Sequence, residues 1–141
     1  MAETTTSDVF SAEEKKAMRE RAKELKAATG KAADAAANEH AIAKLPDDER
    51  ELAERIRTVV VAAAPHLDPK TYYGFPAWAR DGKVVCFFKD AGKFGGRFAT
   101  FGFEDAAKLD EESIWVTSYA IAKLTDADVK KLSELVKRAA G

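Results

Sequence analysis

The chain changes its hydrophobic period from helical to strand-like near residue 70, and this change limits the folds open to it. After Pro46, apolar side chains recur at helical spacing: Leu52, Ile56, Val59, Val60 and Ala63. From Thr71 the apolar residues are mostly aromatic or β-branched and fall in short runs that favour strands. A second helical pattern follows Thr125. Helices, then strands, then a helix predict an α+β domain.

Four strands are predicted, over residues 71–80, 83–89, 97–103 and 114–121. Asp81-Gly82 between the first two indicates a two-residue hairpin, because both residues tolerate the positive φ of a tight turn. Since hairpins dominate the connections, we expect a mainly antiparallel sheet of four or slightly more strands, with the helices packed on one face.

The first 38 residues are predicted to form a tail and a charged helix outside the α+β domain of residues 39–141. Ser11 and Glu14 have the spacing of a capping box, so a helix is expected from here to about residue 28.

Gly30 is interpreted as the stop of this N-terminal helix, and residues 31–38 as a linker or a frayed helical segment. An extension of this kind buries little surface, so we expect it to dock weakly or to bind a partner. Its thin apolar stripe consists of Met18, Ala22 and Leu25.

Composition argues against several classes of function. With 23 basic and 24 acidic residues the formal net charge is −1, so no overall field attracts nucleic acid or an anionic membrane. The apolar runs are far shorter than the roughly 20 residues that span a bilayer. A single cysteine and a polar N-terminus without a signal pattern favour a cytoplasmic protein.

Both faces of the predicted sheet are apolar, although two amphipathic helices can cover only one of them. Strand alternation places Trp78, Phe98, Trp115 and Tyr119 on one face, together with Tyr72 and Phe87, and places Tyr73 and Phe75 on the face of Cys86. An uncovered aromatic face is typical of a ligand groove or an interface, the alternative being cover by the chain itself or by a second copy. The candidate ligand-binding residues are aromatic: Tyr73, Phe75, Trp78, Phe98, Trp115 and Tyr119.

The segment Tyr72-Tyr73-Gly74-Phe75-Pro76-Ala77-Trp78, followed by a hairpin and phenylalanine-rich strands, resembles the YdhG-like family of unknown function. Residues 114–119 and Leu124-Thr125 fit the closing strand and helix of that family. The resemblance covers about residues 40 to 141 and implies a frataxin-like fold. One branch of the family is implicated in iron delivery, so the resemblance implies iron as a candidate cargo.

Frataxin-like proteins bind iron through surface carboxylates, and an acidic cluster at one predicted helix start offers Asp47, Asp48 and Glu51 as candidates. A solvated helix terminus is the favoured alternative interpretation. Cys86 stands alone in a strand pattern and no catalytic motif surrounds it, so no enzyme is predicted.

Two functional hypotheses follow from these patterns. The first is a non-enzymatic binding or delivery module that uses the aromatic sheet face for a small ligand or a protein, with iron as the cargo that the resemblance implies. The alternative is an interaction domain without a metal or catalytic role, whose N-terminal helix docks to a partner or joins two copies in a homodimer.

Overall fold

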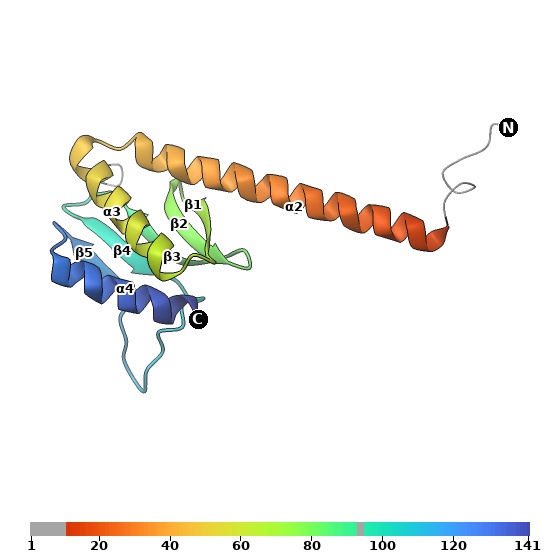
Figure 1. The fold of residues 1–141 in the computed structure, drawn as a ribbon. Helices are drawn as coiled ribbons and strands as arrows, with labels where there is room; N and C mark the ends of the chain where they lie inside the picture. Colours follow the sequence, from red (N-terminus) through yellow and green to blue (C-terminus); the bar gives the residue numbers. More distant parts are fainter. Residues whose placement is uncertain (1–10, 93–94) are drawn as a thin grey trace. The chain divides into compact units, whose positions relative to one another are not determined.

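The computed structural model describes residues 11–92 and 95–141, and Figure 1 labels their helices and strands. Neighbouring strands are all antiparallel and follow chain order across one five-stranded sheet, which confirms the predicted class and sheet type with one strand more than the four expected. The elements are α2 (Ala12–Ala43), α3 (Asp47–Ala63), β1 (Asp68–Tyr72), β2 (Phe75–Arg80), β3 (Lys83–Lys89), β4 (Ala99–Phe103), β5 (Ser118–Ile121) and α4 (Asp126–Ala140).

The additional strand arises because the segment predicted as one strand contains a tight turn. Tyr73 and Gly74 have φ angles of 50° and 84°, and they connect β1 to β2 as a two-residue hairpin. Asp81 and Gly82, at 51° and 80°, connect β2 to β3 in the same way, as predicted. Tyrosine rarely adopts positive φ, so Gly74 alone carried the signal for the first turn.

A β-bulge in β3 sets the faces of the sheet. Trp78 pairs with Cys86 and Ala79 with Val84, which leaves Val85 as the extra residue. Both Val85 and Cys86 are fully buried in the core. Because of the bulge, Trp78 pairs with Cys86 and not with Val85, so the side chains of β2 fall on the opposite faces from those that strand alternation predicted.

Trp78 therefore lies in the core that α3 and α4 cover, and its predicted place beside Phe87 is wrong. Phe75 lies with Tyr72 and Phe87 on the second face instead. Figure 1 shows α3 and α4 side by side across one face of the sheet. The core beneath them is built from side chains of both layers, including Ile56, Val60, Phe88, Phe101, Leu132 and Val136.

The last two strands are shorter than predicted. β4 begins at Ala99 and β5 at Ser118, so Phe98 and Trp115 lie in loops, outside the alternation of the strands. One hydrogen bond precedes β5: the amide of Phe103 donates to the carbonyl of Thr117 at 2.7 Å.

The chain divides between Ala33 and Asp34 into two compact units, and α2 contributes residues to both. The helix begins with the predicted capping box: the Glu14 amide donates to Ser11 Oγ at 3.1 Å, and the Ser11 amide to Glu14 Oε1 at 3.4 Å. The predicted stop at Gly30 is wrong, because α2 continues through it. One glycine costs a helix about 1 kcal/mol, which long alanine-rich flanks tolerate.

The end of α2 belongs to the second unit and is fixed to the first hairpin by Asn38. This side chain is 1% exposed, and its amide donates to the carbonyls of Lys70 and Ala77, each at 3.0 Å. A buried side-chain amide bonded to two strands stabilises one position of the helix end on the sheet.

Among the described residues, no helix combines the length and hydropathy that crossing a membrane requires.

Candidate functional site

An aromatic cluster lies on the second face of the sheet around the first hairpin. We call it the hairpin patch; it consists of Tyr72, Tyr73, Phe75 and Phe87. Ring centroids are 5.2 Å apart for Phe75 and Phe87 and 5.8 Å for Tyr72 and Phe87. Tyr73 at the turn is 77% exposed, whereas Phe75 beneath it is 6% exposed.

Gly102 lies directly beneath the Phe87 ring of the hairpin patch. It pairs with Phe87 across β3 and β4, and a Cβ built on it would lie 2.3 Å from Phe87 Cζ. The ring therefore occupies the volume that any side chain on this residue would need. Tyr72 adds a polar edge: its partial burial, together with the negative charge of Glu104, raises the pKa of its phenol.

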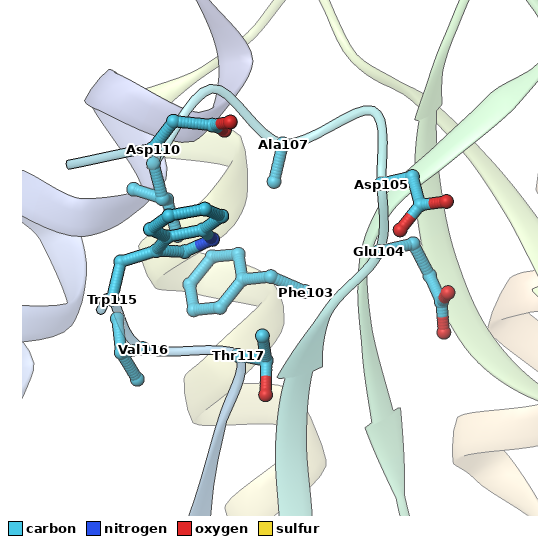
Figure 2. Close-up of a pocket in the computed structure, with 9 residues that line it drawn as sticks. Phe103, Glu104, Asp105, Ala107, Asp110, Trp115, Val116 and Thr117 are labelled. Atoms are coloured by element: carbon cyan, nitrogen blue, oxygen red, sulfur yellow. The ribbon is translucent and has the colours of Figure 1, made fainter. Parts of the chain in front are cut away.

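A separate hollow lies beside Trp115, in the loop between β4 and β5. We call it the Trp115 cavity. It has a volume of about 230 Å³, and its nine lining residues include two aromatic and three acidic ones: Phe103, Trp115, Glu104, Asp105 and Asp110. Figure 2 shows Trp115 and Asp110 on one side, Glu104 and Asp105 on the other, and Phe103 and Ala107 between them.

Arg80 fixes the loop that forms this cavity. Its guanidinium donates to the carbonyls of Ala140 and Ala106, each at 2.6 Å, and to that of Ala139 at 3.3 Å. The loop is also bonded to the end of α4 through the Lys108 amide, which donates to the Ala139 carbonyl at 3.0 Å. The cavity wall is thus attached to the core rather than free in solution.

The predicted ligand-binding residues do not form one site. Tyr73 and Phe75 belong to the hairpin patch, Trp115 lines its own cavity and is 44% exposed, and Trp78 is buried in the core at 1% exposure. Tyr119 packs against the core with Lys131 Nζ 5.0 Å from its ring centroid.

Phe98 lies away from both features, in the segment before β4. It is 43% exposed, and the Arg97 guanidinium carbon lies 5.3 Å from its ring centroid. The Phe98 ring therefore has a cationic neighbour and belongs neither to the hairpin patch nor to the Trp115 cavity.

Of the carboxylates predicted for iron, Asp47 and Asp48 lie in the first turn of α3 and Glu51 follows that turn; all three are exposed. Asp47 binds Arg50 at 2.8 Å, and Asp48 and Glu51 line a shallow hollow with Arg55 and Lys123. In the part of the chain that the structure describes, no three His, Cys, Asp or Glu side chains gather as a metal site. This geometry gives the iron prediction no support.

Cys86 is buried beneath the helices, and burial raises the pKa of its thiol well above the ordinary range. The side chain is therefore a protonated core residue at neutral pH, which agrees with its interpretation from the sequence.

The acidic residues of the Trp115 cavity were missed as site residues. Glu104, Asp105 and Asp110 lie in the polar connection between β4 and β5. Their proximity in sequence to the apolar pair Ile114-Trp115 in the next segment is the available signal. Family models, curated proteins and solved structures were compared with the chain, and nothing matches it. The YdhG-like resemblance and the frataxin-like label stay predictions.

Proposed function

We propose that this protein is a binding module whose hairpin patch receives a protein partner. The observation that carries the proposal is the exposure of Tyr73: an aromatic ring that is 77% exposed stands at the tip of a rigid turn, above the packed rings of Phe75 and Phe87. Tyrosines presented in this way supply contact area with little loss of side-chain entropy, and they are enriched at interfaces.

Two features pre-organise the hairpin patch for binding. Asn38 holds the backbone of both strands of the hairpin, and Gly102 gives the Phe87 ring a fixed seat. A surface that is already ordered loses less free energy when a partner binds. Because no metal cluster forms among the described residues, the proposal does not include iron as a cargo.

Photo-crosslinking tests this proposal, with the two hairpin turns as a matched pair. Tyr73 in one protein and Asp81 in another are replaced by p-benzoylphenylalanine; both sites are exposed turn residues with nearly equal φ. Irradiation in native cell extract should give a discrete adduct from residue 73 and none from residue 81. Excess wild-type protein should compete for this adduct, and excess Tyr73→Asp protein should not. The same adducts from both residues, or none from residue 73, would contradict the proposal.

A second candidate function is self-association through the N-terminal part of α2. Met18 and Leu25 are seven residues apart on one helix face and remain 43% and 53% exposed. This spacing is that of a coiled-coil seam, although a short one. Sedimentation equilibrium of the full chain tests it: Leu25→Glu should shift a dimer toward monomer, whereas a wild-type monomer at all concentrations would remove the idea.

A further inference from the structure

The Trp115 cavity combines features that favour a positively charged ligand. Three acidic residues line it, Glu104, Asp105 and Asp110, and no basic residue does. Within residues 11–92 and 95–141, none of the three forms a salt bridge. The negative charge at the cavity is thus not neutralised by direct ion pairs of the described chain.

The exposed ring of Trp115 favours one class of cation at this cavity. Trp115 lines the cavity and remains 44% exposed; Figure 2 shows Asp110 on its side of the cavity, and buried Phe103 between it and Glu104 and Asp105. Indole faces attract cations, and they attract alkylated ammonium ions in particular, because such ions lose little hydration when they enter an aromatic site. A metal ion, in contrast, requires several oxygen ligands at short distance, and no such group forms here among the described residues.

The volume of the cavity limits the size of the ligand that it can enclose. Pockets that enclose whole drug-sized molecules measure roughly 300–1,000 Å³. At about 230 Å³, the Trp115 cavity suits a headgroup with the rest of its molecule outside. An adjoining hollow shares Asp105 and Asp110 but is also lined by Arg80, Lys83 and Lys108, so its basic side does not favour a cation.

We propose that the Trp115 cavity binds the ammonium headgroup of a small organic cation. The Trp115 ring contacts the alkyl groups of the cation, and the carboxylate of Asp110, which Figure 2 shows on the same side of the cavity as Trp115, supplies the opposite charge. This proposal does not rest on the function proposed for the hairpin patch, so each proposal can fail without the other.

Nuclear magnetic resonance of the full chain tests the site with choline as the probe. The protein has two tryptophans, and the Trp78 indole is buried in the core as an internal control. Choline should shift the Trp115 indole signal saturably and leave the Trp78 signal in place. The neutral isostere 3,3-dimethyl-1-butanol should bind at least about fivefold more weakly, because it lacks the charge.

Variants separate the contributions of the ring and the charge. Trp115→Leu and Asp110→Asn should each weaken choline binding at least about fivefold, with Trp115→Leu followed through the amide signals of Ala107 and Thr117. Glu112→Gln, an exposed acid outside the cavity, should change it little. A peptide with a trimethyllysine, titrated beside choline, distinguishes a protein side chain from a free metabolite as the source of the headgroup. Equal binding of the neutral isostere, or no shift at Trp115 with either cation, would overturn the proposal.

Discussion

The ring of Phe87 lies directly over Gly102, its cross-strand partner, so closely that a Cβ on Gly102 would be 2.3 Å from Phe87 Cζ. Glycine usually weakens a strand because it has no side chain to pack. Here the missing side chain leaves space for a ring that also contacts Phe75 and Tyr72. Gly102 therefore shapes the hairpin patch from the neighbouring strand.

Gly102→Ala should displace the Phe87 ring and destabilise the fold. Over-packing of this kind costs about 1–2 kcal/mol, since the half-buried ring can move but then loses its aromatic contacts. Urea unfolding followed by circular dichroism measures the change. The Tyr72 and Phe87 ring signals should move in the same variant.

A double-mutant cycle checks the cause of that destabilisation. In a Phe87→Ala background the added methyl group has free space, so Gly102→Ala should cost nearly nothing there. Equal costs in both backgrounds would show that the effect comes from the backbone of Gly102 and not from the ring.

Arg80→Met should destabilise the domain by about 2 kcal/mol, because three carbonyls of α4 and the cavity loop lose a charged donor. Arg80→Lys should restore only part of this, since an ammonium cannot reproduce the planar fork of the guanidinium. Arg138→Met is the control near the same helix end. Its exposed pair with Glu111 spans 3.5 Å, and such pairs contribute about 0.5 kcal/mol or less. Equal losses at Arg80 and Arg138 in urea unfolding would contradict this assignment.

The elements with strong local signals were predictable from the sequence. The Asp81-Gly82 turn, the apolar periodicity of α3 and the start of α4 depend on nearby residues, and the structure confirms all three. The capping box at Ser11 is confirmed for the same reason.

Local sequence patterns could not predict which face of the sheet each strand side chain points to. Tyr73 adopts a conformation that tyrosine disfavours, and Val85 forms a bulge that depends on the partner strand. These two features moved Trp78 into the core and Phe75 onto the second face. The sequence therefore named aromatic residues for a site, whereas tertiary packing decided which of them are exposed.

The N-terminus of α4 should make part of the stability of the fold depend on pH. The Thr125 amide donates to Asp128 at 2.9 Å, and this bond is the main reason why the pKa of the Asp128 carboxyl is lowered. A carboxyl with a lowered pKa stabilises the fold above its unfolded pKa of about 3.9 and loses that contribution as the pH falls through its folded pKa.

Asp128→Asn should therefore lower the urea midpoint at pH 7 and converge with wild type in strong acid. Glu134→Gln, an exposed change on the same helix, is the control and should not show this difference. A constant gap between wild type and Asp128→Asn at every pH would mean that ionisation of this carboxyl does not contribute.

Glu104 connects the hairpin patch electrostatically with the Trp115 cavity, since it raises the pKa of Tyr72 and also lines the cavity. Glu104→Gln should lower the pKa of Tyr72, because removal of a nearby negative charge stabilises the phenolate. Burial, the larger cause, remains, so the pKa should stay above the ordinary value of about 10. Titration of the tyrosine ring signals by nuclear magnetic resonance resolves Tyr72 from the other two tyrosines.

Cation binding in the Trp115 cavity should act on Tyr72 in the same direction as Glu104→Gln. A bound ammonium ion stabilises the Tyr72 phenolate, as removal of the Glu104 charge does, so saturating choline should lower the pKa of Tyr72 in wild type and lower it further in Glu104→Gln. Glu111→Gln, whose side chain pairs with Arg138, should leave both the pKa and its response to choline as in wild type. A Tyr72 pKa that does not change with choline while the Trp115 signal saturates would place the bound cation too far from the Tyr72 phenol to affect its ionisation.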